Sequence, residues 1–333
     1  MIRAAIVGIG TWGQNLVRSV EGSERIRFVA GATGTPAKAE AFCRERGIAL
    51  SDSYESLLKS KDVEAVVLAT PHSLHCEQII AAAKAGKHVF VEKPLGLDRK
   101  QAERAVKACA DASVVLAVGY NWRFQPALAE IRRMLEDGRL GTLLHIEGNF
   151  CGPSAYRFAR EHWRQDRDEA PAGGMTGRGV HVVDAMLWLA GKIETVCAQS
   201  YRLVGDSGVD DTTSMLFRFR GGATGYLGTV IATAETWRMQ IFGSKGWAEV
   251  GDVKHLTTWQ LRICFLNDLL EKRKAEVITF PTLSTERAEL EHFAECAAAR
   301  RPIAVPGGDE VHNVAVLEAI LDSVKNDSRV TVK

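Results

Sequence analysis

The chain has almost no excess charge of either sign and no long apolar run. Lys and Arg number 42 against 41 Asp and Glu, so no basic field is present to hold nucleic acid or an anionic membrane. No segment approaches the roughly 18 uncharged apolar residues that a membrane span needs. No basic stretch leads into an apolar segment at the start of the sequence, so we expect no secretory signal.

Cysteine is present but carries no pattern. The seven cysteines are odd in number, scattered, and contain no C-x-x-C pair. This argues against a disulfide framework or a zinc site and favours reduced thiols in a cytoplasmic protein. His72 and His75 stand three apart but have no third ligand nearby in sequence, so we expect no metal.

The first third of the chain alternates short apolar runs with helical segments. We expect strands over Ile2–Val7, Ile26–Ala32, Glu64–Thr70, Lys87–Val91 and Ser113–Val118, with helices such as Gln78–Ala85 and Lys100–Ala110. Short β-rich runs separated by helices predict a parallel sheet covered on both faces, the doubly wound α/β plan. Ligands of such sheets bind at the carboxyl ends of the strands.

A glycine-rich turn joins the first strand to the first helix. Gly8, Gly10 and Gly13 form G-x-G-x-x-G between an apolar run and a helical stretch, with Thr11 and Trp12 inside the motif. The glycines permit a tight turn and close approach of the backbone to a pyrophosphate, and the helix N-terminus offers N–H groups to that phosphate. We expect these five residues to bind a dinucleotide; a purely structural glycine turn is the alternative.

The pattern changes after residue 121. A helix with Leu128, Ile131 and Met134 on one face ends near Gly138, and strand-like segments follow. Met215, Phe217 and Phe219 alternate with other residues at the period of a strand. Further strands over 223–231, 237–242 and 246–250, separated by short turns, predict a mostly antiparallel sheet. With 46% hydrophobic residues over 333 positions, we expect a dinucleotide-binding Rossmann domain over 1–121 and a second α+β domain over 122–333.

One segment makes the interpretation specific. Glu92-Lys93-Pro94 closes a predicted strand of the nucleotide-binding domain. A lysine at that edge can be used in proton transfer, because burial lowers its pKa; a solvated lysine is the alternative. Companion motifs follow in order: Thr70-Pro71 with His75, Gly119 to Phe124 (GYNWRF), His162-Trp163-Arg164, and Gly179-Val180-His181 leading to Asp184.

The order and spacing of these motifs resemble the glucose–fructose oxidoreductase / inositol dehydrogenase (Gfo/Idh/MocA) family over nearly the whole chain. The resemblance implies a Rossmann domain followed by an open-faced antiparallel sheet that serves substrate binding and oligomerisation. It implies Lys93 and His181 as the catalytic residues. The implied cofactor-binding residues beyond the glycine turn are Thr33, Gly34, Lys38, Thr70, Pro71, His75, Glu92, Lys93, Asn121, Trp163 and Arg164. The implied substrate-binding residues are Lys93, Arg123, Tyr156, Trp163, Thr176, Arg178, His181 and Asp184.

The chain departs from the family pattern at the catalytic histidine. The usual pattern is Asp-x-Gly-x-His-x-x-Asp, and here the first position is Gly177. The carboxylate that commonly orients the histidine is therefore absent, and Arg178 stands beside the position. Lys93 then carries more of the acid–base work, another carboxylate reaches His181, or the protein has lost redox activity.

A second departure concerns the cofactor. An NAD-selective Rossmann domain places Asp or Glu about 20 residues beyond the glycine motif, on the ribose hydroxyls. Thr33 stands there, followed by Gly34 and Thr35, with Lys38 close behind. No acid repels a 2′-phosphate, so we expect NADP to be preferred over NAD; a site of dual specificity is the alternative.

These observations predict a cytoplasmic NAD(P)-dependent oxidoreductase that acts on a sugar, cyclitol or related polyol. Lys93 and His181 would handle the hydroxyl proton. An NAD-dependent glycosidase on the same scaffold and a dinucleotide-binding sensor without turnover stay open. The expected partners are a small-molecule substrate and further copies of the chain, in a homodimer or homotetramer, with no nucleic acid and no membrane.

Overall fold

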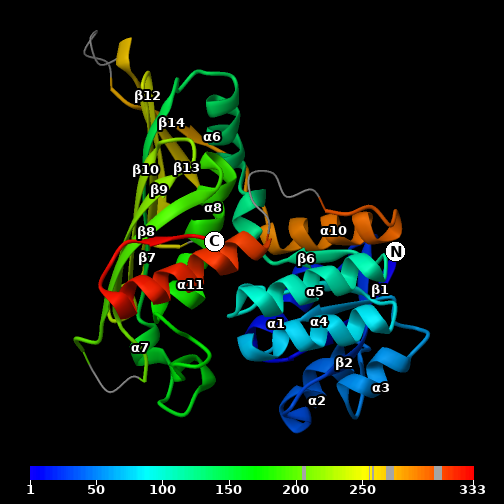
Figure 1. The fold of residues 1–333 in the computed structure, drawn as a ribbon. Helices are drawn as coiled ribbons and strands as arrows, with labels where there is room; N and C mark the ends of the chain where they lie inside the picture. Colours follow the sequence, from blue (N-terminus) through cyan, green and yellow to red (C-terminus); the bar gives the residue numbers. More distant parts are fainter. Residues whose placement is uncertain (205–207, 255, 257–258, 268–273, 304–309) are drawn as a thin grey trace. The chain divides into compact units, whose positions relative to one another are not determined.

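The computed structural model describes residues 1–204, 208–254, 256, 259–267, 274–303 and 310–333. The chain forms two compact units: Met1–Tyr120 with Ser284–Ala304, and Asn121–Leu283 with Val305–Lys333. Figure 1 shows both, coloured along the sequence. No helix in the described ranges has the length and apolarity to cross a membrane.

The first unit is built on a six-stranded parallel sheet in the order β3-β2-β1-β4-β5-β6. Its strands are β1 (Ile2–Val7), β2 (Ile26–Ala32), β3 (Ala49–Leu50), β4 (Ala65–Leu68), β5 (His88–Val91) and β6 (Leu116–Val118). Its helices are α1 (Thr11–Ser19), α2 (Pro36–Glu45), α3 (Tyr54–Lys59), α4 (His75–Lys84), α5 (Arg99–Asp111) and α10 (Thr285–Ala298). The central strands β4 and β5 are buried along their whole length, as the continuous apolar runs in the sequence predict. The doubly wound Rossmann prediction is confirmed.

Helix α10 belongs to the first unit although it lies late in the chain. Phe293 is fully buried and meets Phe90 of β5 edge-on at 5.8 Å, and Leu290 packs into the same core. The expected second domain over 122–333 therefore differs from the structure at residues 284–304. The apolar face of α10 completes the Rossmann core, a long-range contact that the local pattern of the sequence does not encode.

The second unit is built on a nine-stranded sheet in the order β14-β13-β12-β11-β7-β10-β9-β8-β15. Its strands are β7 (Leu143–Cys151), β8 (Ile193–Tyr201), β9 (Thr212–Phe219), β10 (Thr224–Val230), β11 (Thr236–Gly243), β12 (Gly246–Asp252), β13 (Gln260–Phe265), β14 (Glu276–Thr279) and β15 (Val330–Thr331). Neighbouring strands are antiparallel except β10 and β7, which run parallel, so the mostly antiparallel prediction is confirmed.

Helices cover one face of this sheet. They are α6 (Pro126–Glu136), α8 (Val180–Ala190) and α11 (Glu310–Asn326), with the short α7 (Ser154–Arg157) after β7. Helix α8 packs on β7 and α11 on β8 (Figure 1). Beneath them lies an aromatic core in which Trp122 meets Phe150, Trp237 and Trp259 at ring distances of 5.0–5.4 Å.

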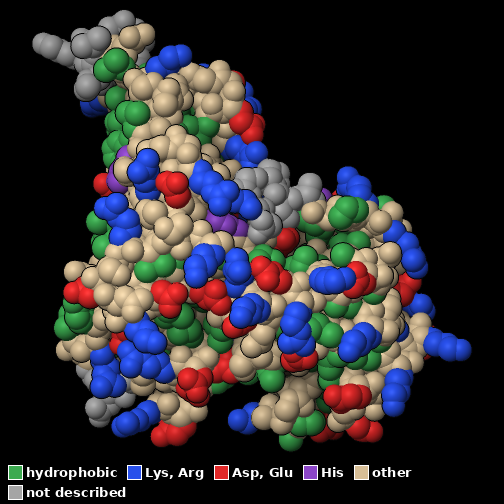
Figure 2. Space-filling model, viewed as in Figure 1, with side chains coloured by type: hydrophobic (Ala, Val, Ile, Leu, Met, Phe, Trp, Pro, Cys, Tyr) green, Lys and Arg blue, Asp and Glu red, His purple; other side chains and the backbone are tan. Residues whose placement is uncertain are grey.

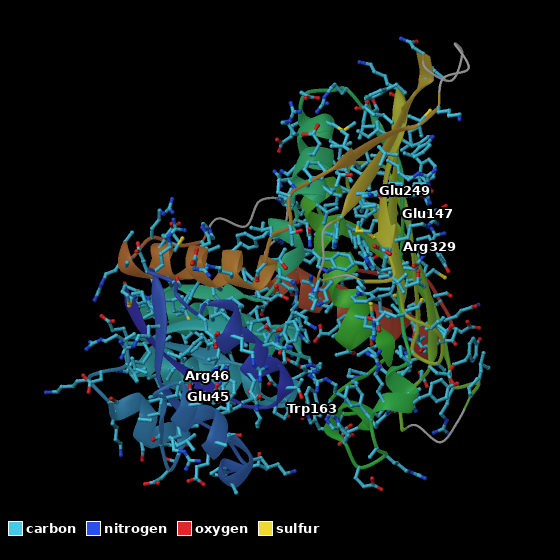
Figure 3. The ribbon with its side chains drawn as sticks, turned by 180° about the vertical axis from the view of Figure 1, so that it is seen from behind. Glu45, Arg46, Glu147, Trp163, Glu249 and Arg329 are labelled. Atoms are coloured by element: carbon cyan, nitrogen blue, oxygen red, sulfur yellow. The ribbon has the colours of Figure 1, made fainter. Side chains whose placement is uncertain are left out.

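The opposite face of the nine-stranded sheet has no helix over it in the described residues. One register row crosses this face through Leu216, Tyr226, Glu147, Gln240 and Glu249. Leu216 and Tyr226 are exposed, while Arg238 bonds Glu147 at 2.7 Å and approaches Glu249 at 3.4 Å. Figure 3 labels the two glutamates on the strands of the second unit.

Candidate active site

The turn after β1 has the backbone form that the glycine motif predicts. Gly8 has φ +90°, and a Cβ there would collide with the carbonyl group of Ala69. A Cβ on Gly13 would collide with the carbonyl oxygen of Gly8, whereas one on Gly10 would stand in open space. Only glycine therefore fits at positions 8 and 13, and the space over Gly10 is open to a ligand.

Helix α1 begins at this turn with its N-terminal N–H groups uncapped. Gly10 supplies no side-chain cap, and the first turn holds no Asp or Glu. The first N–H groups of a helix have no partner within the helix, and their dipoles attract an anion. Trp12, by contrast, packs partly buried against the core of the unit. The turn can hold a pyrophosphate by the mechanism expected from the sequence.

The end of β2 carries hydroxyls and a base. Thr33 follows the strand, and its hydroxyl accepts a hydrogen bond from the backbone N–H of Thr35 at 3.5 Å. Helix α2 begins without a side-chain cap or an acid in its first turn, where Lys38 is exposed. Gly34 is exposed as well. A phosphate at this helix start would meet a hydroxyl and an ammonium group.

Glu92 and Lys93 follow β5 at the carboxyl edge of the same sheet. Glu92 is buried, and its Oε1 has no hydrogen-bond partner among the described residues. Burial raises the pKa of this carboxyl group, and the neighbouring Lys93 opposes that shift. A side chain at Gly119 would press on the same carboxylate, at 3.1 Å from Oε1. An orphaned buried acceptor at the ligand-binding edge of a Rossmann sheet fits a bound nicotinamide ring.

Thr70, Pro71 and His75 form the neighbouring edge, after β4. The Thr70 hydroxyl donates to Gln78 at 2.6 Å, and Pro71 precedes the 3₁₀ turn His72–Leu74. His75 has no exposed surface; its Nδ1 lies 2.8 Å from the carbonyl oxygen of Pro94 and its Nε2 lies 3.1 Å from that of Thr70. His75 thus joins the loop after β4 to the loop after Lys93 and positions both.

In the second unit, His181 stands in the first turn of α8 against aromatic rings. It is 7% exposed, and its imidazole stacks on Trp122 at 5.6 Å with an interplanar angle of 18°. Phe150 lies 6.2 Å from the same ring. Trp122 and the buried Asn121 belong to the short turn Asn121–Phe124. The aromatic core therefore fixes the plane of the imidazole.

Arg123 and Asp184, both expected to bind substrate, bind each other. The Arg123 Nε donates to Asp184 Oδ2 at 2.8 Å and its Nη2 donates to Oδ1 at 2.6 Å. Asp184 is 1% exposed, and burial raises the pKa of its carboxyl group while Arg123 opposes the shift. Both carboxylate oxygens therefore accept hydrogen bonds from the one guanidinium group.

Gly177 lies in a π-helical turn, Met175–Gly179, which leads directly into α8. Its φ is not in the left-handed region, and a Cβ there would meet nothing within 4 Å. The backbone therefore accepts a side chain at this position. The adjacent Thr176 is buried, and its hydroxyl donates to the carbonyl oxygen of Pro171.

Arg178 lies against Phe150, with its guanidinium carbon 4.8 Å from the ring centroid. It donates to Ser154 Oγ at 3.3 Å, to the Cys151 carbonyl at 3.2 Å and to Glu235 at 3.3 Å. Glu235 has no sequence signature, since it lies in a turn between strands and far from Arg178 along the chain. No local pattern therefore marks Glu235 as a partner of Arg178.

Trp163 and Arg164 belong to a stacked group on the segment after α7, where Figure 3 labels Trp163. The Arg164 guanidinium lies 4.1 Å from the centroid of Trp163. His162 stacks between Trp163 and Phe158 at 5.7 and 4.5 Å, and its Nδ1 accepts the Arg164 N–H at 3.1 Å. Tyr156, in α7, is 65% exposed and outside this stack. The order of rings comes from the turn geometry, so the sequence motif alone could not reveal the parts of Phe158 and His162.

Comparison with known proteins matches both parts of the chain. Residues 2–120 match the model of the oxidoreductase family with an NAD-binding Rossmann fold, and residues 128–249 match the GFO/IDH/MocA C-terminal domain. The chain belongs to the Gfo/Idh/MocA family. Membership makes it an oxidoreductase, as the sequence motifs predict.

Family relatives of similar length include a scyllo-inositol 2-dehydrogenase (NAD⁺) of Bacillus subtilis strain 168. It is 26% identical over 98% of this chain and 94% of its own length. A 2,7-anhydro-N-acetylneuraminate hydratase of Escherichia coli K12 is 30% identical over 67% of this chain and 60% of its own. The structure of a levoglucosan dehydrogenase in complex with NADH and L-sorbose has the same fold, with a TM-score of 0.90 at 23% identity over 100% of this chain and 99% of that one.

Proposed function

We propose that this protein transfers a hydride between a nicotinamide dinucleotide and a carbon that bears a hydroxyl group in a sugar, cyclitol or related polyol. One observation carries the proposal: the glycine turn and Lys93 leave the carboxyl edge of one parallel sheet, from β1 and β5 on either side of β4. A pyrophosphate site and a proton-transfer group at one sheet edge suit dehydrogenation. The names of the inositol and levoglucosan relatives support the substrate class.

Different residues of the chain bind the cofactor and transfer the proton. The dinucleotide, when bound, supplies the hydride acceptor or donor. Gly8, Gly10 and Gly13 admit its pyrophosphate at the start of α1, and Glu92 offers an acceptor to its nicotinamide end. Lys93 takes the hydroxyl proton as the C–H bond breaks, and returns it in the reverse direction. His181 assists Lys93, because an imidazole side chain is suited to proton exchange near neutral pH.

The remaining predicted ligands have supporting roles. We propose that the cofactor also contacts Thr11, Thr70, Pro71 and Asn121, and that the substrate contacts Tyr156, Trp163, Arg164 and Thr176. We propose that His75 acts on the cofactor through the loops of Thr70 and Pro94, because it has no exposed surface. Asp184 acts on the substrate through Arg123, because both of its carboxylate oxygens accept hydrogen bonds from that guanidinium group.

We further propose that NADP is preferred over NAD. Support comes from Thr33, Gly34 and Lys38 at the uncapped start of α2, where no acid stands in the first turn. A carboxylate there would accept the ribose hydroxyls of NAD and repel a 2′-phosphate. One relative is named as NAD⁺-dependent. The cofactor preference of this chain must therefore be measured directly.

A redox-neutral reaction on the same scaffold is the second candidate. It is favoured by Gly177, which removes the carboxylate usually paired with the catalytic histidine, and by a relative named a hydratase. An enzyme of this kind, an NAD-dependent glycosidase among them, oxidises and then reduces its substrate within one turnover. It recycles bound cofactor and produces no net change in nicotinamide absorbance.

The chain is proposed to act as a homodimer or homotetramer in the cytoplasm. The sheet face without helices exposes Leu216 and Tyr226 in one row, and apolar side chains on an otherwise polar sheet favour burial against another copy. All seven cysteines are free, which suits a reducing compartment. Charges of both signs are mixed over the surface seen in Figure 2, in keeping with the near-zero net charge.

The test is a screen of hexoses, sugar acids and cyclitols with NADP⁺ and NAD⁺, followed at the absorbance band of the reduced nicotinamide. Lys93→Ala is the control and should lose about 10²–10⁴-fold in turnover while it keeps cofactor affinity. Product formation without net absorbance change favours the redox-neutral candidate. Cofactor binding with no product from any sugar would refute both enzymatic proposals and favour a sensor.

A further inference from the structure

The guanidinium group of Arg178 is held in place by hydrogen bonds that do not use all of its N–H donors. Its three hydrogen bonds to described residues are all long, 3.2–3.3 Å, and use Nε and Nη1 only. Nη2 donates to no residue in the described part of the chain. By contrast, the Arg123 guanidinium meets Asp184 with two bonds of 2.6–2.8 Å. A guanidinium group has five N–H donors in a planar fork, so Arg178 can still take an oxyanion.

Two glycines shape the surroundings of this guanidinium. A Cβ on Gly152 would lie 2.6 Å from Nη2, so Gly152 makes the room that Arg178 occupies. A Cβ on Gly177, the preceding residue in the chain, would meet nothing within 4 Å. Gly177 also stands four residues before His181 on a continuous helical stretch, a spacing that places two side chains on one face.

The carboxylates of this region are already neutralised. Asp184 is bound by Arg123, and Glu235 lies 3.3 Å from Arg178 and 3.4 Å from Arg157. The two guanidinium groups carry two positive charges and Glu235 carries one negative charge, so the group of three has a net charge of about +1. Arg178 is 14% exposed in its side chain, so this charge is poorly screened by water and attracts anions strongly.

We propose that Arg178 and the open space over Gly177 form a subsite for a carboxylate of the substrate, so that the preferred substrates are sugar acids rather than neutral polyols. The proposal rests on the proposed dehydrogenase function. The substrate carboxylate then stands where the family has a protein carboxylate, close to His181. The absence of a side chain at position 177 would therefore favour acidic substrates.

The experiment compares matched pairs, glucuronate with glucose and galacturonate with galactose, on the full-length protein saturated with NADP⁺. We expect kcat/KM, and affinity in isothermal titration calorimetry, to favour each hexuronate by about tenfold or more, the usual effect of a charge-assisted hydrogen bond. Arg178→Gln should abolish this preference. Arg157→Gln removes the exposed partner of Glu235 and should change it by less than about threefold.

Gly177→Asp and Gly177→Asn separate charge from size. The aspartate should repel the hexuronate and reverse the preference, whereas the asparagine, equal in size but neutral, should reduce it far less. Equal effects of the two variants, or a wild-type preference for the hexoses, would overturn the proposal. So would an Arg178→Gln variant that loses NADP⁺ affinity and keeps its hexuronate affinity.

Failure of the dehydrogenase proposal gives a different result. Hexuronates would bind in calorimetry with the expected dependence on Arg178, yet no nicotinamide would be reduced. The carboxylate subsite would then stand and the proposed reaction would fall.

Discussion

Arg123 and Asp184 form a buried ion pair in which both carboxylate oxygens accept hydrogen bonds from one guanidinium group, at 2.8 and 2.6 Å. The pair ties the turn Asn121–Phe124 to α8. Trp122 belongs to that turn and stacks on His181 of α8. The ion pair therefore holds the aromatic support of the histidine in place, and two residues expected to contact substrate are structural partners of each other.

Asp184→Ala should lower the free energy of unfolding by about 3–5 kcal/mol, because it leaves the Arg123 charge buried without a partner. Urea denaturation measures the effect. Lys107→Ala, which breaks the exposed pair with Asp111, is the matched control and should cost at most about 1 kcal/mol. Equal losses for the two variants would show that the buried pair contributes no more than a surface one.

His181→Ala should reduce turnover less than Lys93→Ala does. At position 177 the chain has no carboxylate to orient the imidazole, so Lys93 carries the larger part of the proton transfer. Lys93→Ala should cost about 10²–10⁴-fold in kcat, with dinucleotide affinity retained. Thermal melting of both variants must agree before the rates are compared. A larger loss for His181→Ala at equal stability would make His181 the main proton carrier.

Thr33→Asp should shift cofactor preference from NADP towards NAD. The wild type is expected to bind NADP(H) about tenfold or more tightly than NAD(H), since one charge-assisted phosphate contact contributes roughly 1.5–3 kcal/mol. Lys38→Ala should weaken NADP(H) alone. Fluorescence titration of each protein with both cofactors gives the dissociation constants. Tighter binding of NAD(H) by the wild type would contradict the preference.

Glu92→Gln should stabilise the protein increasingly as pH rises. Burial places the pKa of Glu92 above its unfolded value, so the folded chain disfavours the ionised form and loses stability as pH rises through the folded-state pKa. At about pH 8 the variant should be more stable than the wild type by roughly 1–3 kcal/mol, and the gain should shrink near about pH 4.

Glu64→Gln is the control of opposite sign for that experiment. The backbone N–H of Arg3 and its side chain lower the pKa of Glu64, so its contribution is present above the unfolded pKa and is lost as pH falls. At high pH, Glu64→Gln should therefore be less stable than the wild type. Melting temperatures that shift in the same direction for both variants would contradict the assignment of either carboxyl group.

Leu216→Glu should weaken self-association through the open sheet face. Leu216 is 58% exposed and pairs in register with Tyr226 of β10 and Cys197 of β8. A charge in the centre of an apolar contact is costly to bury, so light scattering should show the wild type as a dimer or tetramer and the variant as a smaller species. Arg329→Glu, on an exposed residue close to position 333, is the control. A monomeric wild type at micromolar concentration would refute the oligomer.

Local sequence patterns specify the two folds and the identity of the chemical groups. The continuous apolar runs of β1, β4 and β5 describe a buried parallel sheet, and the alternation at Met215, Phe217 and Phe219 describes a half-exposed strand, because periodicity records which faces leave water. The glycine turn after β1 can likewise be predicted from the sequence motif. Gly8 and Gly13 are required by close backbone approach, a local constraint that leaves its mark in the motif.

Which of these groups contact each other depends on long-range packing. Arg123 pairs with Asp184, Arg178 packs on Phe150 and bonds Glu235, and His75 contacts the carbonyl group of Pro94. Each of these contacts joins residues that belong to different segments of the chain. Helix α10 joins the Rossmann core in the same way. A residue type specifies which hydrogen bonds and charges are available, whereas the partner that satisfies them is set by packing, and no local pattern in the sequence records it.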